Sequence, residues 1–550
     1  TSRFTVAAKS PLTGGFGEAE GGGWWAPEFK WAGYDAIIFK GVSPKPVYLW
    51  IHDDKVELRD AQHLTGKVTG EAEKMIRDEL QDQKIRIAQI GPAGEKMVSY
   101  SCICNECAHF NGRTGMGAVM GSKRLRAVAV KASGKNAYHD LEKIKEITKD
   151  FAKNWKAVEQ PFHDYGTAGG VEGLNAGGIL PTRNFREGQF EGASAISGQT
   201  MAETILIRRG HCYACPVRCK REVEVKDKYD VDPYYGGPEY ETVGAFGSLC
   251  GNDNLPSIAK GNELCNKYGL DTISTGTTIA FAMECFEQGI INKQHTDGID
   301  LKFGNADAIL AMIDKIAHLQ GIGAILAKGV AKAAREFGNG AEQYAMHVKG
   351  QELPMHEPKG KVNVGIQYAI SPTGADHMEI PHDVIFTEDA FPLDSVKPLG
   401  LIDTIDPLDL SAKKIRFTSY TERVWSLYNC IGLCMFTGVP MGALSLENLV
   451  ALVKAVTGWN TSLFELIKVA EKSNTMARCF NLREGFTSQD DTIPDRIFKA
   501  FTTGPLKDKP IDRDEFKQAI KTYYAMQGWD EEGVPTKAKL AELGLEWIEC

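Results

Sequence analysis

The sequence predicts an α+β fold in which a β-rich N-terminal domain precedes two mostly α-helical domains. Up to about residue 134, short apolar or alternating runs are typical of strands. From about residue 141, apolar residues recur three and four positions apart, as in amphipathic helices. The glycine-rich joints between the helical segments lie at residues 169–170, 236–237 and 338–340. We expect domains over residues 1–135, 136–345 and 346–550.

The individual elements follow from these patterns. The expected strands lie at residues 3–9, 36–39, 47–51, 56–58, 86–90 and 125–130. Asp53 and Asp54 supply a tight turn, and one helix at residues 71–83 interrupts the strands. The expected helices of the later domains lie at residues 141–158, 255–268, 308–319, 324–337, 446–456 and 462–473.

Charge and composition exclude several classes of protein. Lys and Arg number 63 against 72 Asp and Glu among 550 residues, which gives a net charge of −9. Without a clustered basic stripe, nucleic acid and anionic membrane are poor partners. No apolar run approaches the roughly 18 residues that span a bilayer. We therefore expect a cytoplasmic protein, and because Thr1 starts a strand-like run without Met, we expect the natural chain to be longer.

Thirteen cysteines are too few for a disulfide scaffold and indicate a reducing compartment with metal chemistry. Cys212, Cys215 and Cys219 suit three corners of one [4Fe–4S] cube. Cys434 is the best remote fourth ligand, since it follows a glycine in a motif, Asn-x-x-Gly-Leu-(Asp/Cys)-x, that also occurs at residues 266–272. Zinc is the alternative, with His211 adjacent.

A second group, Cys102, Cys104 and Cys107, allows two interpretations. It is either another metal site or part of a β-domain wall with soft, buried side chains.

Glycines gather in three stretches, at residues 14–17, 21–25 and 112–121. Main-chain N–H groups of such loops can converge on the phosphates of a ligand, and Arg113 would add a bidentate contact. Turns are the alternative, because no stretch matches a P-loop or a dinucleotide fingerprint.

Acid–base groups concentrate in two places. Glu239 and Glu241 stand two residues apart after a Gly-Pro, and His377 follows a glycine turn and Asp376. A buried Glu could take a proton from water, and a nearby His could hydrogen-bond a carbonyl group. A solvated carboxylate pair and a helix cap are the alternatives.

Seven motifs in order along the chain resemble the tungsten-containing aldehyde:ferredoxin oxidoreductases. They lie at residues 10–14 (SPLTG), 31–37 (WAGYDAI), 112–123 (GRTGMGAVMGSK), 212–219 (CYACPVRC), 237–242 (GPEYET), 268–276 (YGLDTISTG) and 431–434 (IGLC). The resemblance implies a β-rich pterin-binding domain, with its N-terminal part missing here, and two helical domains that cover it. It also implies a tungsten bis-pyranopterin centre, with Mg²⁺ bridging the pterin phosphates, beside a [4Fe–4S] cluster.

Site residues follow from the resemblance position by position. The implied cluster ligands are Cys212, Cys215, Cys219 and Cys434. The implied cofactor-binding residues are Arg3, Gly22, Gly112, Arg113, Asn266, Asp271, Asn429 and Leu433. The implied general base is Glu241, with Glu239 as the fallback, His377 as its partner and His356 as a weaker candidate.

The chain departs from the family pattern in two respects. Asn266 and Asn429 stand where the two pterin motifs usually open with Asp, which keeps an acceptor oxygen but loses a charge. Glu379 replaces a basic residue after His377, which argues against a phosphate ligand there.

The resemblance implies oxidation of an aldehyde to a carboxylic acid, with electrons passing through the cluster to ferredoxin or an Fe–S partner subunit. We expect a homo-oligomer or a hetero-complex. Molybdenum in place of tungsten stays open. Two rivals remain: a relative that reduces an aromatic acyl-CoA thioester, as benzoyl-CoA reductase does, and a catalytically silent Fe–S electron-transfer subunit.

Overall fold

The computed structural model describes residues 3–550 and confirms the α+β architecture. The N-terminal part is built on a six-stranded sheet of order β4-β3-β8-β5-β6-β7. Its strands are β3 (Val47–His52), β4 (Lys55–Asp60), β5 (Arg86–Ile90), β6 (Ile103–Asn105), β7 (His109–Asn111) and β8 (Leu125–Lys131). Neighbouring strands pair antiparallel except β3 and β8, which are parallel. The helices among them are α1 (Trp25–Trp31), α2 (Thr69–Glu79), α3 (Pro92–Glu95) and α4 (Met116–Ser122).

Helices cover both faces of this sheet because side chains alternate along each strand. In β8, Val128 and Val130 pack with residues of α1 and α4 such as Phe29. Ala127 and its neighbour on the same face pack instead against Ile76 of α2. The continuous apolar run of β8 therefore reflects burial on both sides.

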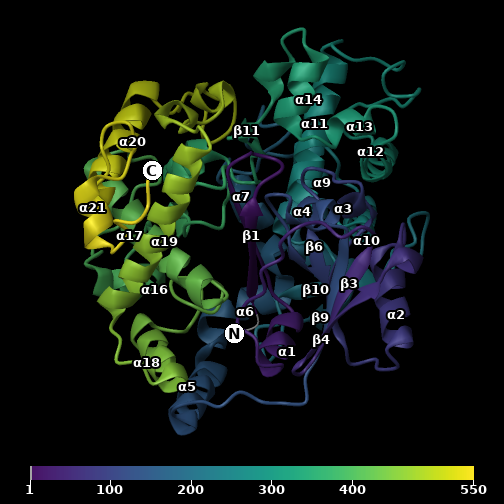
Figure 1. The fold of residues 1–550 in the computed structure, drawn as a ribbon. Coiled ribbons are helices and arrows are strands. Elements are labelled where there is room, and N and C mark those ends of the chain that lie inside the picture. Colours follow the sequence, from purple (N-terminus) through teal and green to yellow (C-terminus); the bar gives the residue numbers. More distant parts are fainter. Residues whose placement is uncertain (1–2) are drawn as a thin grey trace.

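The first two strands form a separate hairpin, β1 (Phe4–Lys9) with β2 (Phe16–Gly21). Its turn is tied to the C-terminal part of the chain, since the backbone N–H of Phe16 donates to Oδ1 of Asn481 at 2.6 Å. In Figure 1 the purple strand β1 accordingly runs between the sheet and the yellow-green helices.

Helices dominate the remainder of the chain. Those up to residue 337 are α5 (Leu141–Asn154), α6 (Lys156–Tyr165), α7 (Val171–Ala176), α8 (Gly198–Thr204), α9 (Tyr240–Phe246), α10 (Leu255–Tyr268), α11 (Thr272–Glu287), α12 (Ala306–His318), α13 (Gly323–Leu326) and α14 (Val330–Phe337). The later ones are α15 (Val362–Ile370), α16 (Phe391–Val396), α17 (Ala412–Ile431), α18 (Leu446–Thr457), α19 (Leu463–Arg483), α20 (Arg513–Gln527) and α21 (Lys537–Glu542). Short strand pairs, β9 (Leu206–Gly210) with β10 (Lys220–Val223) and β11 (His347–Val348) with β12 (Gln351–Glu352), interrupt them.

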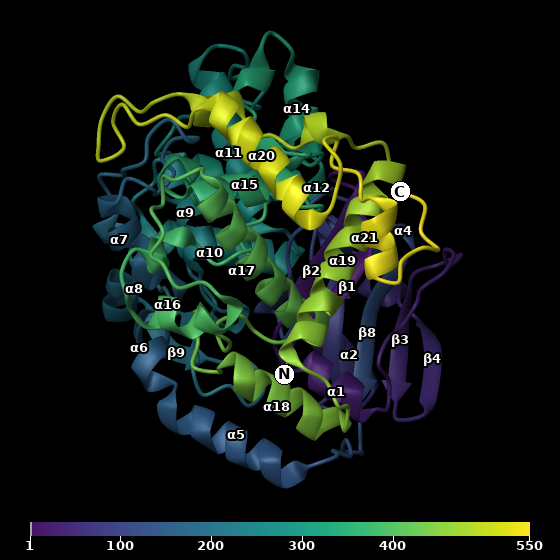
Figure 2. The ribbon, with the colours of Figure 1, turned by 90° about the vertical axis from the view of Figure 1, so that its left-hand side faces the viewer.

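Segments distant in sequence share their cores. The largest apolar cluster joins residues of α9 to α15 with residues of α20, such as Phe246, Tyr368 and Phe516. Figure 2 shows α18 alongside α5, where the backbone N–H of Asp140 donates to the carbonyl oxygen of Ala455 at 2.8 Å. The division near residue 345 into a second and a third domain stays a prediction. None of the helices within residues 3–550 combines the length and apolar character that a membrane crossing needs.

Three expected elements are wrong in detail. Residues 36–39 form no strand, and Ile38 is 81% exposed, because β-forming side chains make a strand only where they pair with another strand, and these residues do not. The expected helix at 141–158 is two helices, α5 and α6. The expected helix at 324–337 breaks at Gly329, whose φ of +89° lets Glu352 accept the first backbone N–H of α14.

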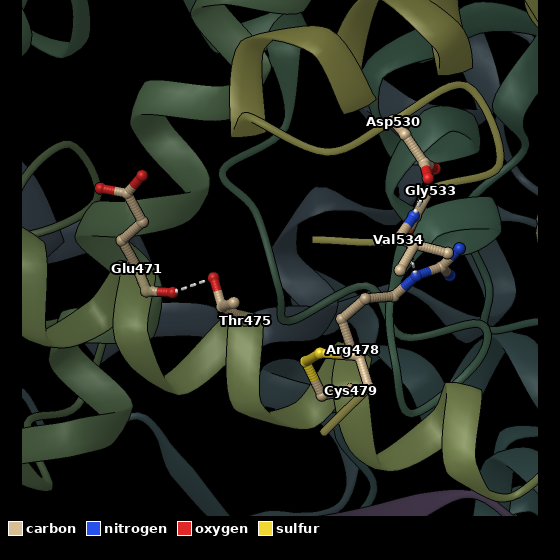
Figure 3. The surroundings of a disulfide bond; sticks show 8 residues. Glu471, Thr475, Arg478, Cys479, Asp530, Gly533 and Val534 are labelled. Atoms are coloured by element: carbon tan, nitrogen blue, oxygen red, sulfur yellow. Dashed lines mark hydrogen bonds between the residues drawn. A yellow bond between two sulfur atoms is a disulfide. The ribbon is translucent and has the colours of Figure 1, made fainter. Parts of the chain in front are cut away.

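The expectation of metal chemistry without disulfides is wrong for one pair of cysteines. Cys479 of α19 is bonded to Cys550 across 71 residues of sequence. The chain after α20 turns back onto α19, where Arg478 donates from Nε to the carbonyl oxygen of Gly533 at 2.8 Å (Figure 3). Spacing alone could not reveal this pair, because tertiary packing brings the two sulfurs together.

Gly115 supplies a test of this part of the fold. Its φ is +80°, and a Cβ there would overlap the carbonyl oxygen of Ser99. We expect Gly115→Ala to destabilise the protein by about 2 to 5 kcal/mol, since it adds left-handed strain to a backbone clash. Gly33→Ala is the matched control, because Gly33 has φ +94° but open space, so only about 1 kcal/mol is expected. Unfolding temperatures of the two variants measure the difference, and equal shifts would contradict the close approach.

Candidate active site

The cysteine motif forms an irregular loop between β9 and β10. Ala214 and Arg218 adopt left-handed backbone conformations with φ of 54°, which fold the loop back on itself. The loop rests on the N-terminal glycines, because Tyr213 donates its backbone N–H to the carbonyl oxygen of Gly23 at 3.0 Å. A Cβ on Gly22 would lie 2.8 Å from the Sγ of Cys212. Gly22 therefore allows the loop to approach, and it does not line the cavity described below.

The structure brings the four predicted cluster cysteines together. Burial raises the pKa of Cys212, and the neighbouring Cys434 raises it further. Burial likewise raises the pKa of Cys215 to about 11, with Cys434 and Cys212 adding to it. Burial, Glu239, Cys434 and Cys212 raise the pKa of Cys219. Neighbouring thiols raise the pKa of Cys212, Cys215 and Cys219 in this way, and such a group suits a metal cluster, whose positive charge stabilises thiolates.

The spacing of these thiols favours a cube over a single zinc ion. Among residues 3–550, the only group of three or more candidate ligands whose donor atoms lie within 4.8 Å of one another is Glu241, His356 and His377. The four sulfurs are neighbours without reaching that spacing, as four corners around a larger inorganic core would be.

The remaining cysteine motif lies in the wall of the β-rich domain. Cys102, Cys104 and Cys107 are buried, and Cys107 donates from Sγ to Oε2 of Glu73 at 3.5 Å. None of them belongs to a group with single-ion spacing in the part of the chain that the structure describes. The wall interpretation stays a prediction.

A cavity of about 280 Å³ lies where the three parts of the chain meet. Its lining includes the predicted residues Arg3, Gly112, Arg113, Asn266, Asp271, Asn429, Glu239, Glu241 and His377. A larger cavity of about 1260 Å³ shares Arg3 and Asn429 with it. The larger cavity reaches three of the four cluster cysteines and Leu433, so one continuous region joins nearly all the predicted site residues.

Two of the predicted ligand-binding residues are free to contact a ligand in this region, one through open space beside its backbone and one through an unpaired hydrogen-bond acceptor. A Cβ on Gly112 would meet no atom within 4 Å, so a ligand can approach its backbone. Asn429 has a buried Oδ1 without a hydrogen-bond partner, which leaves an acceptor for a ligand N–H. Arg3 is held toward the cavity by Glu20, whose Oε2 accepts from Nε at 2.8 Å.

Arg113 makes hydrogen bonds to the backbone. Its two terminal nitrogens donate to the carbonyl oxygens of Ala375 and Glu352, both at 2.6 Å. Only Nε is without a hydrogen bond, and it lies 3.5 Å from Oδ2 of Asp271. Each Nη atom already donates to one backbone carbonyl oxygen, and the bidentate phosphate contact stays a prediction.

The repeated sequence motif has one structural form at both places. Helices α10 and α17 each end at a left-handed glycine, Gly269 with φ +75° and Gly432 with φ +64°. The residue two positions after each glycine, Asp271 or Cys434, has a different role at the two places. Asp271 caps α11 by accepting the backbone N–H groups of Ile273 and Ser274, whereas Cys434 joins the other thiols. The motif thus places two similar helix ends beside the cavities.

The two candidate bases have different surroundings. Glu239 accepts a hydrogen bond from Thr167 at 2.7 Å and forms an ion pair with Lys220 at 2.9 Å. Burial raises the pKa of Glu239, but the charge of Lys220 outweighs burial and the pKa is lowered. Glu241 lies against two imidazoles instead, with Oε1 at 3.1 Å from Nε2 of His356 and 3.6 Å from Nε2 of His377. The geometry favours Glu241 as the base.

Both histidines are neutral in this setting. Burial lowers the pKa of His377 to about 4, despite the opposing charge of Glu241, so its ring can donate a hydrogen bond without carrying charge. Burial, Lys361 and His377 lower the pKa of His356 well below its usual range. The weaker sequence candidate, His356, is thus the nearer neighbour of Glu241. The ligand atoms of Glu241, His356 and His377 all lie within 4.8 Å of one another, an arrangement suited to proton exchange.

Several polar residues of the site were missed by sequence reasoning. Glu18, Glu20, Asp376 and Glu379 form an acidic wall of the cavity. Burial, with Glu20 and Asp376, raises the pKa of Glu18 to about 7, and burial with Glu18 raises that of Glu379. Asp376 gave a signal as the neighbour of His377, and Glu379 gave one as the replacement of a basic residue. Lys361 and His382, behind His356, gave none, because single residues carry no pattern.

Two family models match nearly the whole chain. One, described as "Aldehyde ferredoxin oxidoreductase, N-terminal domain", matches residues 1–132, and the other, "Aldehyde ferredoxin oxidoreductase, domains 2 & 3", matches residues 142–545. The chain belongs to the aldehyde ferredoxin oxidoreductase family. The resemblance inferred from the motifs is therefore confirmed, and the protein is an oxidoreductase of this family.

Similar proteins differ in the substrates that their names give. The tungsten-containing aldehyde ferredoxin oxidoreductase of Pyrococcus abyssi is 38% identical over 554 residues, which cover 99% of this chain and 87% of that protein. The aliphatic sulfonate oxidoreductase, WOR-like subunit, of Pyrococcus furiosus is 29% identical over 575 residues, with 99% and 85% covered. The active site complex BamBC of benzoyl coenzyme A reductase, solved with 1,5 dienoyl-CoA, matches with a TM-score of 0.83 and 26% identity over 99% of this chain and 86% of that one.

The cluster assignment gives a paired test. We expect Cys434→Ala to lose about four irons per chain and the EPR signal of the reduced cluster, because a cube with three thiolates is held poorly. Cys430→Ala is the control, since Cys430 lies on the same helix end but is exposed and free. Iron, acid-labile sulfide and EPR measure both variants. A full iron content in Cys434→Ala would contradict the assignment.

Proposed function

We propose that this family member oxidises an aldehyde to a carboxylic acid, with water as the oxygen source. The observation that carries the proposal is the placement of Glu241 and His377 on the wall of a cavity that adjoins a larger one lined by Cys212, Cys215 and Cys434. A carboxylate and a neutral imidazole on one wall are the groups that hydration of a carbonyl requires.

The residues of the site have separable roles in this reaction. Glu241 removes a proton from the attacking water, since its Oε2 is fixed by the backbone N–H of Met355 at 2.8 Å while Oε1 lies on the imidazole side. His377 donates a hydrogen bond to the aldehyde oxygen, which makes the carbonyl carbon more electrophilic. Because His377 is neutral, this donation needs no counter-charge in the cavity.

The chain fits a tungsten bis-pyranopterin group and a [4Fe–4S] cluster. Arg3, the backbone at Gly112 and the free Oδ1 of Asn429 would hold the pterin part, and Cys212, Cys215, Cys219 and Cys434 would hold the cluster. When bound, these groups would take two electrons from the substrate and pass them on singly. Ferredoxin or an Fe–S partner subunit is the proposed acceptor. Molybdenum would suit the same ligands, and no residue described above selects a Mg²⁺ position.

A second candidate is the reduction of an aromatic acyl-CoA. The TM-score of 0.83 to the benzoyl coenzyme A reductase complex supports it. The higher identity, 38%, to a protein named for aldehyde oxidation supports the first candidate.

One assay separates the two functions. The holoenzyme is supplied with a panel of aliphatic and aromatic aldehydes and a viologen acceptor, and separately with benzoyl-CoA and a low-potential donor. We expect viologen reduction with at least one aldehyde and no dienoyl product. The reverse result would refute aldehyde oxidation, and inactivity in both assays by protein that contains tungsten and iron would refute both candidates.

The role of Glu241 is tested by substitution. We expect Glu241→Gln to retain tungsten and iron but to lose roughly 10²- to 10⁴-fold in kcat, because the amide keeps the hydrogen bond from Met355 and cannot accept a proton. Metal analysis and steady-state kinetics measure this. Glu239→Gln is the discriminating partner, since Glu239 already pairs with Lys220. A larger kcat loss in Glu239→Gln than in Glu241→Gln would reverse the assignment.

A further inference from the structure

Lys361 is a buried amine in unusual surroundings. The residue is only 1% exposed, and its Nζ lies 2.7 Å from Nδ1 of His356 and 3.3 Å from Nδ1 of His382. Within residues 3–550, no carboxylate oxygen lies within the 4.0 Å of an ion pair to this amine. The nearest acid along the chain from His382, Asp383, is bound to Lys414 at 2.6 Å. A buried ammonium is costly without such a partner, so this amine is suited to exchange its proton.

Each of the two histidines that contact Lys361 also contacts a further group. On one side, Nε2 of His356 lies 3.1 Å from Oε1 of Glu241. On the other side, Nε2 of His382 lies 3.1 Å from the carbonyl oxygen of His377, and His382 is partly exposed. Glu241 lines the cavity, whereas His356, Lys361 and His382 are not among its lining residues. Three proton-exchanging groups, each within 3.3 Å of the next, therefore lie between Glu241 in the cavity wall and the partly exposed His382.

We propose that His356, Lys361 and His382 form a proton relay that carries protons from Glu241 out of the active site. The relay rests on the proposed function, because conversion of an aldehyde and water to a carboxylic acid releases two protons with two electrons. The electrons leave through the metal groups, and the protons need a separate route out of a buried site.

Each transfer balances. The O–H bond of protonated Glu241 breaks as the proton bonds to Nε2 of His356, while the Nδ1 proton of His356 passes to the lone pair of Lys361. The resulting ammonium gives a proton to Nδ1 of His382, whose imidazolium then releases one proton to water. After the transfer, His356 carries its proton on Nε2 and His382 carries its proton on Nδ1. A rotation that exchanges the positions of the two nitrogens of each ring then turns a free lone pair toward the next proton. Glu241 ends as a carboxylate and Lys361 as a neutral amine, and both are ready for the next proton.

The charges around Lys361 set the pH at which the relay works. Burial lowers the pKa of Lys361 to about 7, against the opposing charges of Asp383 and Glu241. His356 and His382 face the amine as neutral rings, since burial lowers the pKa of each well below its usual range. His377 acts on both rings, and Lys414 neutralises Asp383. Lys361 is therefore neutral, and able to accept a proton, above about pH 7, and protonated below it.

The main experiment compares Lys361→Met with wild-type holoenzyme. We expect a roughly 10²-fold loss of kcat with unchanged KM, because substrate binding does not involve the relay. The wild-type kcat should fall as the pH drops through about 7, and the variant should lack that limb and show a larger solvent deuterium isotope effect. Wild-type kcat and pH dependence in Lys361→Met would overturn the proposal.

Two further variants exclude a merely structural role. Lys361→Arg keeps a donor for both imidazoles but stays protonated, so a relay predicts no rescue, whereas rescue by Arg would overturn it. The double variant Glu357→Gln with Lys359→Met is the control for burial. It removes a neighbouring buried ion pair, 3.2 Å apart, as a unit, and should leave kcat unchanged. An equal kcat loss in that control would also overturn the assignment.

A spectroscopic arm separates the relay from the proposed function. In protein labelled with [ε-¹³C]lysine, the resonance missing from Lys361→Met identifies Lys361. We expect it to titrate near pH 7 and its midpoint to shift in Glu241→Gln, whether or not any aldehyde is turned over. If the wild type oxidises no aldehyde, the function fails while such a titration still supports the coupled relay. A lysine that stays protonated to pH 10 would refute the relay, whatever the activity.

Discussion

The buried guanidinium of Arg113 holds the walls of the active site together. It extends from the loop between β7 and α4 and donates to the carbonyl oxygens of Glu352 and Ala375, which lie in the C-terminal half of the chain. Its Nε faces Asp271, the cap of α11. A buried cation must have such acceptors, since an uncompensated one costs several kcal/mol. The three parts of the chain are therefore bound to one charge, and the cavity lies beside it.

The elements that could be predicted from the sequence are those with a regular pattern of apolar residues. The apolar run of β8 reflects burial on both of its faces, and the apolar spacing of α10 and α12 reflects burial on one face of each helix, so the sequence predicts these elements. The cysteine loop was predictable for another reason, since metal ligands close in sequence keep a fixed spacing. Residues 36–39 have the composition of a strand but pair with no other strand. Strand pairing depends on the whole fold, so local composition could not predict this.

The site itself was predictable only where chemistry has a short-range pattern. Glu241 and His377 belong to local motifs, and the structure brings them to 3.6 Å from each other. The closer contact of Glu241 is with His356, from a segment that offered a weaker motif. Lys361, the acidic wall and the bond between Cys479 and Cys550 depend on tertiary packing of distant segments, which no spacing in the sequence encodes.

The two helix ends at Gly269 and Gly432 give the site a polarity. Their backbones and preceding Asn residues are alike, but one ends in a carboxylate bound to backbone N–H groups and the other in a thiol. A ligand with two similar halves would therefore meet similar shapes and dissimilar charges. Its two halves would differ in electron affinity although their covalent structures are the same.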